Sequence, residues 1–274
     1  KAQRKQAVIK MGLQGPSGSG KTYSALLLAY GLVKDWDKVA VIDSENHSAD
    51  LYAHLGDFSV VSLGPPFSTE KYIEAISLCE AAGMEVIILD SISHEWDGSG
   101  GIIDLHSNMM GNSFTNWGKV TPLHNGFVNK ILQSPAHIIA TIRSKQDYIL
   151  SERNGKMVPE KIGLKGVTRD GMDYEFTIVL DLDLKHNAAS SKDRTGLFMD
   201  KTPAIITEAT GELIKTWCMN GIKVSDIETM IEECTTIDGL RHILIKYPEF
   251  RKKIEPAIYR RKSQIDALAT AVTH

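Results

Sequence analysis

Short apolar runs alternate with amphipathic stretches along the first half of the chain. The runs "AVIKMGLQ", "KVAVID", "FSVVSL", "EVIILD" and "HIIATI" are rich in β-branched residues, which is typical of buried strands. Between them, "TYSALLLAYGLV" and "STEKYIEAISLCEAAG" carry helix formers, with Ser68 or Thr69 as a cap and Gly83 as a stop for the second. Strands that alternate with helices predict βαβ units, so we expect an α/β core with a mostly parallel sheet flanked by helices.

The pattern changes after residue 144. "QDYILSERNGKMVPEK" has two β-like arms around Asn154-Gly155, which predicts an antiparallel hairpin extension. We expect "MDYEFTIVLDLDL" (172–184) and "GLFMD" (196–200) to continue this antiparallel character. The Gly-, Ser- and Asn-rich stretch 95–119 is expected to contain a loop.

Helix formers and charged residues dominate from about residue 221. Leu240, Ile243, Leu244 and Tyr247 recur at helical spacing, and Pro248 and Pro256 are expected to divide the stretch into short helices. We therefore expect a core over residues 1–220 and a small helical region over 221–274. The basic runs 251–253 and 260–262 are typical of solvated helix faces, with contact to DNA as the alternative.

Charge balance, cysteine spacing and the length of the apolar runs limit the classes of protein to which the chain can belong. The 31 Lys and Arg residues nearly balance 34 Asp and Glu residues, giving a net charge of -3, so any site for a polyanion must be local. The three cysteines are far apart and in no metal-like spacing, which fits thiols in a reduced compartment. Because no apolar run approaches 20 residues and no apolar segment follows the basic N-terminus, we expect a cytoplasmic protein without a membrane partner.

The segment "GPSGSGKT", residues 15–22, matches the phosphate-loop pattern G-x-x-x-x-G-K-[ST] between a predicted strand and a predicted helix. Its glycines let backbone N–H groups face a phosphate chain, while Lys21 reaches the terminal phosphates and Thr22 the magnesium ion. A chance Gly/Ser loop is the alternative. We expect ATP and Mg²⁺ as cofactors, and the expected nucleotide-binding residues are Gly15, Pro16, Ser17, Gly18, Ser19, Gly20, Lys21 and Thr22.

Two acids after predicted strands extend this site. Asp90 ends an apolar run and is expected to order the magnesium shell with Thr22. Many AAA-type ATPases place a catalytic Glu directly after that Asp, whereas this chain has Ser91, so the base is expected elsewhere. Glu45 follows the strand that ends at Asp43, at the ligand-binding edge of a parallel sheet, and could polarise the attacking water. A surface acid on a turn is the alternative for Glu45, and Glu95 is a second candidate base.

The segment "IDSENHSADLYAHLG" resembles the part of RecA-type recombinases that carries their catalytic glutamate, which implies that Glu45 is the base. "VIILDSIS" is similar to that family's magnesium-site strand, and "HIIATIRSK" to the next strand, whose end senses the γ-phosphate. Thr141 holds the sensor position, where RecA has a glutamine, and Arg143 is the alternative carrier. Over about residues 7–220 the chain resembles phage-type RecA-like single-strand annealing proteins, which implies a RecA-like P-loop NTPase core.

The segment "SSKDRTG", residues 190–196, places Lys192 and Arg194 two residues apart at the end of a predicted strand, where their side chains point the same way. It resembles the Lys-x-Arg finger of RecA-like hexameric helicases and KaiC-type ATPases, which reaches the ATP of the neighbouring subunit. The resemblance implies trans-acting catalysis in a homo-oligomer, either a ring or a filament. A solvated strand end is the alternative.

The same resemblance places single-stranded DNA between two loops. Trp96, Phe114 and Trp117 are available for base stacking in the first, with core packing as the alternative. The second spans 144–171 and could equally be a solvated hairpin. Its basic residues are Lys145, Arg153, Lys156, Lys161, Lys165 and Arg169.

These features together favour a DNA-dependent ATPase that acts on single-stranded DNA in phage-type homologous recombination, by annealing or strand exchange. The resemblance implies a bacterial or phage-infected cell as its setting and a single-strand binding protein as a further partner. A RecA-like hexameric motor or helicase is the first alternative. A P-loop kinase is the second, and it would need a lid arginine and an acceptor pocket.

Overall fold

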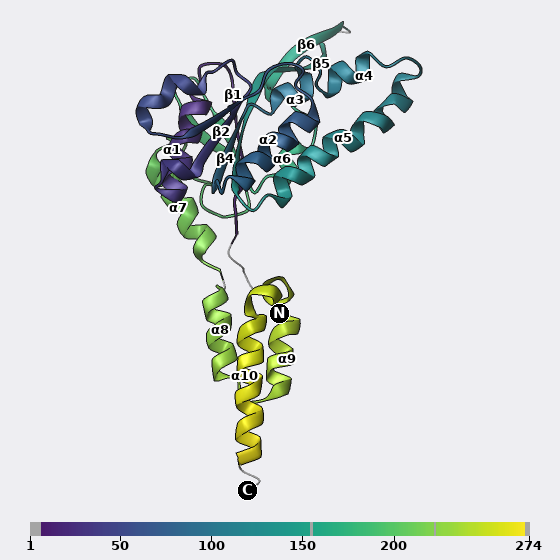
Figure 1. Ribbon diagram of the computed structural model, residues 1–274. Helices are drawn as coiled ribbons and strands as arrows, with labels where there is room; N and C mark the ends of the chain where they lie inside the picture. Colours follow the sequence, from purple (N-terminus) through teal and green to yellow (C-terminus); the bar gives the residue numbers. More distant parts are fainter. Residues whose placement is uncertain (1–6, 154–155, 222, 272–274) are drawn as a thin grey trace. The chain divides into compact units, whose positions relative to one another are not determined.

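A computed structural model describes residues 7–153, 156–221 and 223–271 (Figure 1). The chain divides into a larger unit, Val8–Trp217, and a smaller unit that contains the helices after Cys218. The two units are described separately below. Within the described residues, no helix is both long enough and apolar enough to cross a membrane.

The larger unit is built on one sheet with the strand order β3-β2-β4-β5-β1-β7-β8-β9, to which β6 is added as a partner of β5. All pairings from β3 to β7 along this order are parallel, and β7-β8-β9 are antiparallel, which confirms the predicted mostly parallel α/β sheet. The strands are β1 Lys10–Gly15, β2 Val39–Asp43, β3 Ser59–Ser62, β4 Val86–Asp90, β5 His137–Arg153, β6 Lys156–Gly166, β7 Ile178–Leu182, β8 Asn187–Asp193 and β9 Ala204–Ile205.

Strand register brings the ends of three strands and residue 143 of β5 to one edge of the sheet. Asp43 at the end of β2 pairs with Asp90 at the end of β4, and Gly15 at the end of β1 pairs with Arg143 in β5. In a parallel sheet the carboxyl ends share one edge, and ligands bind there. The predicted site residues of β1, β2 and β4 therefore meet at this edge.

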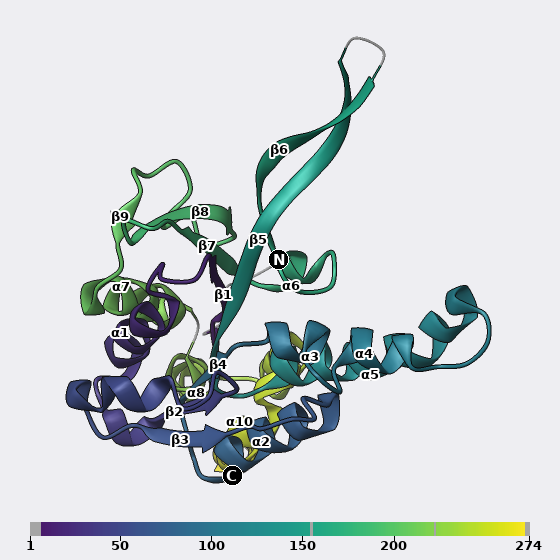
Figure 2. The same ribbon diagram turned by 90° about the horizontal axis from the view of Figure 1, so that it is seen from above.

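Helices cover both faces of the sheet. Their bounds are α1 Lys21–Val33, α2 Thr69–Ala81, α3 Ser93–Asp97, α4 Ile102–Ser107, α5 Ser113–Gln133, α6 Met172–Glu175 and α7 Glu208–Met219, with short 3₁₀ helices η1 Trp36–Lys38 and η2 Ala49–Leu55. Figure 2 shows α1 and α7 on one side of the central strands and α2, α3 and α5 on the other. Buried Tyr72 and Phe127 pack α2 and α5 against Ile42, Ile87 and Ile138 of the sheet. Successive side chains of β2, β4 and β5 point to opposite faces of the sheet, and helices cover both faces. Every position of these strands is therefore buried, which explains their uninterrupted apolar runs.

The predicted limits of α2 are confirmed. The Ser68 side chain accepts a hydrogen bond from the Lys71 N–H and caps the first turn, while Gly83 follows the last turn with φ 78°.

The predicted hairpin is also confirmed, because β5 and β6 pair antiparallel from Ser144–Gly166 to Arg153–Lys156. Its predicted turn, Asn154-Gly155, lies outside the described residues. Residues 137–143 of β5 pair within the parallel sheet, and the strand then continues into the hairpin, which projects from the rest of the unit (Figure 2).

The stretch 95–119 forms α3, α4 and the start of α5, and the expected loop is confined to the connections 98–101 and 108–112. Two predictions for this unit are wrong. Residues 172–175 form α6, and β7 lies parallel to β1 in the body of the sheet, so only its pairing with β8 is antiparallel. The segment 196–200 lies in the connection between β8 and β9 and is not a strand.

The smaller unit contains α8 Val224–Glu233, α9 Ile237–Lys246, η3 Pro248–Phe250 and α10 Arg251–Ala271. Its core includes Ile227, Leu240, Ile254 and Ile258. Pro248 opens η3 as expected, but Pro256 lies inside α10 and does not divide it. Ile254 and Ile258 on either side of Pro256 are both buried, so packing keeps the helix intact across the missing N–H.

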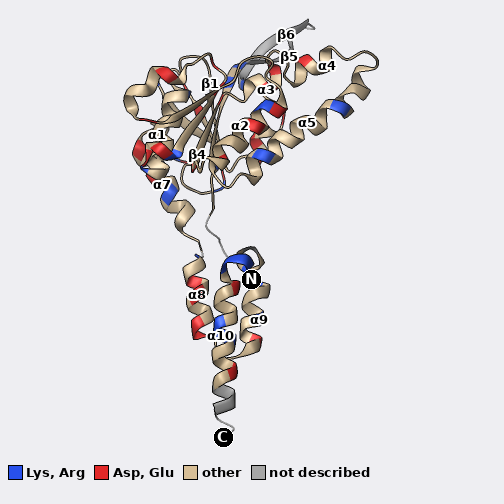
Figure 3. Ribbon diagram, in the orientation of Figure 1, with Lys and Arg blue, Asp and Glu red and all other residues tan. Residues whose placement is uncertain are grey.

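The first basic run of this unit is exposed. Arg251, Lys252 and Lys253 lie at the start of α10, where Figure 3 shows a group of Lys and Arg. In the second run, Arg261 is partly buried and its Nε donates to the Cys234 carbonyl at 2.9 Å, so this side chain helps to pack the helices. No further role for either run follows from these contacts.

Candidate nucleotide-binding site

The phosphate loop joins the end of β1 to the start of α1. Gly18 (φ 79°) and Gly20 (φ 83°) adopt left-handed backbone conformations, which glycine reaches without strain. A Cβ on Gly15 would lie 2.5 Å from Ser19 Oγ and 2.7 Å from the Leu182 carbonyl oxygen, so this position also requires glycine. The resulting tight turn and the first turn of α1 line a pocket of about 450 Å³. We call it the phosphate-loop pocket.

Lys21 projects from the first turn of α1 and folds back over the loop. Its Nζ donates to the carbonyl oxygens of Gly15 and Pro16, both at 3.0 Å. Burial lowers the pKa of Lys21, against the opposing effect of the nearby Asp90 and Glu45 carboxylates. Because carbonyl oxygens are weaker partners than phosphate oxygens, the ammonium group can transfer to a bound nucleotide.

Thr22 and Asp90 form the candidate magnesium site. Thr22 Oγ1 donates to Asp90 Oδ2 at 2.7 Å, and Thr141 Oγ1 donates to Asp90 Oδ1 at 2.5 Å. Burial raises the pKa of Asp90, while the two hydroxyl hydrogen bonds act in the opposite direction.

These groups fit magnesium bound together with a nucleotide. No cluster of three or more His, Cys, Asp or Glu side chains able to hold a metal occurs in the part of the chain that the structure describes. Mg²⁺ bound with a nucleotide needs only one or two protein oxygens, because phosphate oxygens and waters complete its octahedron. Ser48 Oγ, in a residue that lines the same pocket, is buried without a hydrogen-bond partner among the described residues and offers another polar contact.

Thr141, the residue at the predicted sensor position, lies behind this site. It is fully buried, and its hydroxyl is engaged by Asp90. Arg143, two residues further along β5, lines the phosphate-loop pocket instead. The sensing role of Thr141 stays a prediction, and Arg143 is the better placed of the two residues to touch a nucleotide.

Glu45 lies on the turn after β2. Asp43 fixes this turn, because its carboxylate accepts the N–H groups of Glu45 at 2.6 Å and Ala49 at 2.8 Å. Glu45 lines the phosphate-loop pocket together with Lys21 and Thr22. Its Oε1 accepts from Ser91 Oγ at 2.8 Å and from Arg143 Nε at 2.7 Å, and its Oε2 accepts from Arg143 Nη2.

The electrostatics of Glu45 are set by opposing effects. Burial alone would raise the pKa of Glu45, but the hydrogen bonds from Arg143 and Ser91 hold it below its ordinary value. Glu45 is therefore ionised at neutral pH, as a proton acceptor must be.

The second candidate base, Glu95, is excluded by its surroundings. Its side chain is 1% exposed and accepts hydrogen bonds from His124 Nδ1 at 3.0 Å and Thr69 Oγ1 at 3.2 Å. It ties α3 to α5 and α2 and does not line the phosphate-loop pocket. Glu95 is thus held in a structural contact, and Glu45 is the better placed of the two candidate bases.

Two further residues at this site carry no recognisable sequence signal. Tyr52 of η2 lines the pocket, with its ring centroid 5.8 Å from that of Tyr23, and offers an aromatic surface for a base. His186, in the turn between β7 and β8, places Nδ1 3.2 Å from the Ser19 carbonyl oxygen and so supports the phosphate loop. A 3₁₀ turn and a strand-to-strand turn are too irregular for sequence periodicity to place these side chains.

Lys192 and Arg194 point the same way, as predicted, but they lie away from the phosphate-loop pocket. Lys192 Nζ donates to the carbonyl oxygens of Asp173, at 2.8 Å, and Tyr174. Arg194 Nη2 donates to the Tyr174 carbonyl at 3.0 Å. Both cations therefore bind the end of α6 in the single chain, and their action on a neighbour's ATP stays a prediction.

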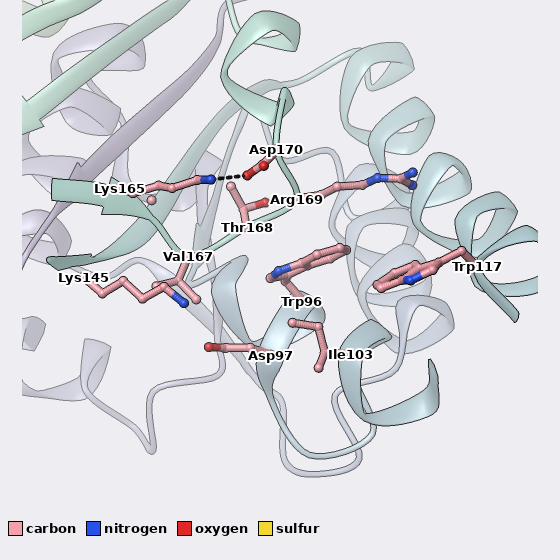
Figure 4. A pocket seen from close by; sticks show the side chains of 11 residues that line it. Trp96, Asp97, Ile103, Trp117, Lys145, Lys165, Val167, Thr168, Arg169 and Asp170 are labelled. Carbon is pink, nitrogen blue, oxygen red and sulfur yellow. Dashed lines mark ion pairs between the residues drawn. The ribbon is translucent and has the colours of Figure 1, made fainter. Parts of the chain in front are cut away.

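A second pocket, of about 560 Å³, lies beside the base of the hairpin (Figure 4). Trp96 and Trp117 line it with nearly parallel rings, their centroids 6.0 Å apart, and His106 stacks on Trp117 at 4.0 Å. Lys145, Lys165 and Arg169 contribute to the lining from the hairpin side, and Lys165 pairs with Asp170 at 2.7 Å. We call this the tryptophan pocket.

Four of the predicted DNA-binding residues thus come together: Trp117, Lys145, Lys165 and Arg169. Trp96 and Trp117 are only partly buried, so neither is an ordinary core residue. Phe114 is 86% exposed and lies outside the lining. The side chains of the remaining three, Arg153, Lys156 and Lys161, lie outside the described part of the structure.

The phosphate loop, the Thr22–Asp90 pair and the parallel sheet define an α/β P-loop NTPase. The chain matches the model of the AAA domain family over residues 7–210 and belongs to this family. This membership implies ATP binding and ATPase activity, and such enzymes generally use Mg²⁺.

Other comparisons add little. Among solved structures the chain is similar to a KaiC-like protein of the hyperthermophilic archaeon Pyrococcus horikoshii, with 16% identity, coverage of 76% of this chain and 96% of that chain, and a TM-score of 0.40. A likeness this distant carries no argument about function. No protein with a curated description matches the chain in sequence.

Proposed function

We propose that the protein is a DNA-dependent, RecA-like ATPase that acts on single-stranded DNA in phage-type homologous recombination, by annealing or strand exchange. The observation that carries this proposal is the tryptophan pocket, in which stacked aromatic rings and hairpin cations meet next to the strand that leaves the ATP site.

The lining of the tryptophan pocket suits single strands. Unpaired bases stack on aromatic rings irrespective of sequence, and Lys and Arg bind the phosphates between them. Within the described residues, the side chains of Lys145 and Arg169 make no ion pair, so both charges are available to a ligand.

Strand β5 offers the physical basis for DNA dependence. Thr141 binds Asp90 at the ATP site, Arg143 binds Glu45, and Lys145 lies two residues further on in the tryptophan pocket. The Val167 N–H also donates to the Arg143 carbonyl at 2.7 Å and ties the return strand to the same residue. A ligand that moves either end of this segment acts on the other through a continuous hydrogen-bonded element.

The proposal includes a homo-oligomer in which Lys192 and Arg194 act in trans. Neither cation lines the phosphate-loop pocket or the tryptophan pocket of its own chain. The ATP of a neighbouring subunit is therefore the site that fits their predicted catalytic role.

The DNA site can be tested by titrating labelled oligothymidine into the wild type and into Lys145→Ala/Arg169→Ala at several salt concentrations. We expect weaker binding and a salt slope that is lower by about 0.7 for each phosphate that the variant no longer neutralises, because fewer counterions are released. Trp117→Ala should weaken binding by about 1–3 kcal/mol because a base can no longer stack there, with little change in the salt slope.

The matched control is Arg251→Ala/Lys252→Ala, which removes the same charge from the exposed start of α10. It should bind DNA as the wild type does. If this control loses affinity and the pocket variant does not, DNA binds the C-terminal helices instead. ATP turnover measured with and without oligothymidine should show stimulation by DNA, and equal turnover would remove the DNA dependence.

A further inference from the structure

A small apolar pocket lies at the β9 end of the sheet and shares no lining residue with the two pockets described above. Its volume is about 150 Å³, and its walls come from β7, β8, β9, α7 and the connection between β8 and β9, elements that lie together in Figure 2. The apolar lining consists of Leu180, Leu197, Phe198, Ile205, Ile206 and Leu213. We call it the β9 pocket.

The β9 pocket also contains a polar group without a partner. Ser190 of β8 lines it, and the Ser190 hydroxyl oxygen is buried with no hydrogen-bond partner among the described residues. A buried hydroxyl that makes no hydrogen bond costs free energy. An apolar cavity of about 150 Å³ admits a benzene ring, so one apolar side chain fits a pocket of this size. The pocket therefore suits one apolar side chain that is accompanied by a hydrogen-bonding atom.

An exposed side chain of this kind lies beside the ATP site of the same chain. In the 3₁₀ helix η2, Leu51 is 76% exposed and His54 is also exposed. Side chains three residues apart in a 3₁₀ helix lie on the same side, so Leu51 and His54 face solvent together. Ser48 and Tyr52, on either side of Leu51, line the phosphate-loop pocket. One face of η2 thus offers an apolar side chain and a ring nitrogen at the border of the ATP site.

We propose that the β9 pocket is the docking site for η2 of a second copy of this chain. Leu51 of one subunit fills the apolar pocket of the next, and His54 supplies the hydrogen-bonding atom for the Ser190 hydroxyl. The inference rests on the homo-oligomer of the proposed function and names the surfaces by which its subunits meet. Because the two surfaces differ, the contact is head-to-tail.

The positions of the two surfaces fit action of the finger cations on a neighbour's ATP. Lys192 lies near the end of β8, and Ala188 and Ser190 of the same strand line the β9 pocket. The docking segment η2 borders the phosphate-loop pocket. A subunit that brings Lys192 towards its neighbour's ATP therefore also brings its β9 pocket towards the neighbour's η2.

Charge complementarity also favours a second copy as the occupant. Residues 39–70, which include η2, contain no Lys or Arg, and Asp50 beside Leu51 is exposed. On the other surface, Lys201 lines the β9 pocket and is exposed. Lys192 and Arg194 donate to backbone carbonyl oxygens rather than to carboxylates. An acidic surface thus meets a basic one, which favours association of one with the other over association of like surfaces.

Sedimentation velocity of the full chain with Mg²⁺ and the β,γ-imido analogue of ATP measures self-association without turnover. Leu51→Asp and Leu213→Asp each place a charge on one of the two surfaces. Either change should raise the dissociation constant for self-association by about tenfold or more, because a buried leucine contact is lost. The matched control is Leu78→Asp, since Leu78 is 60% exposed on α2 and does not line the β9 pocket, and it should associate as the wild type does. Circular dichroism of each variant checks that it is folded.

Mixing the two variants tests the head-to-tail contact. A Leu51→Asp subunit keeps its β9 pocket, and a Leu213→Asp subunit keeps its η2. An equimolar mixture therefore has one intact pair of surfaces and should form dimers without larger species. A mixture of folded variants that stays monomeric would overturn the docking.

The contact of His54 has its own test. His54→Ala should raise the dissociation constant by about twofold to tenfold, because a hydrogen bond is lost. The same change in a Ser190→Ala background should have a smaller effect, because the hydroxyl is no longer there to be satisfied. Equal effects in both backgrounds would overturn the placement of His54 next to Ser190.

The wild type separates failure of the docking from failure of the proposed function. A wild type that associates, together with Leu51→Asp and Leu213→Asp variants that associate equally well, would overturn the docking and leave the homo-oligomer in place. A wild type that stays monomeric with both the ATP analogue and oligothymidine would overturn the homo-oligomer of the proposed function, and the docking with it.

Discussion

Three carboxylates meet at the ATP site, and their partners assign them different roles. Asp43 accepts backbone N–H groups and shapes its own turn, and Asp90 accepts the hydroxyls of Thr22 and Thr141. Glu45 instead binds side chains, one of which is the long and partly exposed Arg143. Glu45 is thus the acid of the three that is held by side chains rather than by a backbone turn, and it lines the phosphate-loop pocket, as a base that activates water must.

Replacing Glu45 with Gln tests this role. The amide cannot take a proton from water, so phosphate release should fall by about 10²-fold or more, while binding of the ATP analogue persists. Phosphate release is measured at saturating ATP, and Lys21→Ala serves as the control that loses nucleotide binding. Turnover near the wild-type level would remove Glu45 from the mechanism.

The sequence predicts which residues of a local motif form the site, but it does not predict the side-chain hydrogen bonds between residues far apart in the chain. It places the phosphate loop, Asp90 and Glu45 at one edge, as the structure does, because a strand followed by a glycine turn or an acid is a local signal. The bond between Glu45 and Arg143 joins residues 98 positions apart. Lys192 in β8 and Arg194 just after β8 both donate to the Tyr174 carbonyl. Long side chains choose such partners only after the sheet has formed, so no sequence spacing reveals them.

At the scale of elements, α1 and α7 approach unusually closely. A Cβ on Gly31 would lie 2.1 Å from the Glu208 carbonyl oxygen and 2.7 Å from Gly211 Cα, and a Cβ on Gly211 would lie 2.4 Å from the Leu28 carbonyl oxygen. Because these neighbours are backbone atoms, a methyl group can fit only if the helices separate. The close packing of α1, which begins at the phosphate loop, against α7 therefore depends on the glycines at positions 31 and 211.

Gly31→Ala should destabilise the larger unit. Alanine favours a helix by about 1 kcal/mol over glycine, but the forced separation of α1 and α7 should outweigh this and leave a net loss of about 1–3 kcal/mol. Urea unfolding followed by circular dichroism measures the difference. Gly118→Ala is the matched control, because Gly118 lies in α5 with no neighbour within 4 Å of the added Cβ, and it should stabilise by up to about 1 kcal/mol. Equal effects at both positions would refute the close-contact explanation.

Sequence predictions at this scale are wrong where tertiary contacts override local preference. The stretch 95–119 is rich in residues that favour loops, yet its loops are confined to 98–101 and 108–112. The rest forms helices, which are held in place by the buried Glu95–His124 pair and by Asn116, which is 2% exposed. Pro256 is typical of a helix end, but buried Ile254 and Ile258 hold it within α10. The strands of the parallel sheet are predicted well because they are buried on both faces. Such burial requires a continuous run of apolar, β-branched residues, and this run is visible in one sequence.

At the scale of the whole molecule, the proposed oligomer depends on Lys192 and Arg194. In the single chain both cations bind carbonyl oxygens at the end of α6, just after the segment 165–170 that lines the tryptophan pocket. Carbonyl oxygens are weaker partners for a cation than phosphate oxygens, so a neighbour's ATP could draw the pair away.

Mixing two inactive variants tests action in trans. An Arg194→Ala subunit keeps Glu45 but cannot supply the arginine, and a Glu45→Gln subunit keeps Arg194 but cannot activate water. If the arginine acts across the subunit interface, the mixture contains interfaces with an intact Glu45 on one side and an intact Arg194 on the other. Phosphate release should then rise well above that of either variant alone, because a finger supplied in trans is worth about 10³-fold or more in rate.

The mixture is interpretable only if the variants assemble with each other. Co-purification of differently tagged subunits establishes this first, and mixing each variant with itself provides the baseline. An arginine that acts in its own chain predicts no recovery at any ratio, since every active site then carries one lesion. Mixed assembly without recovered hydrolysis would show that Lys192 and Arg194 serve α6 of their own chain and not a neighbour's ATP.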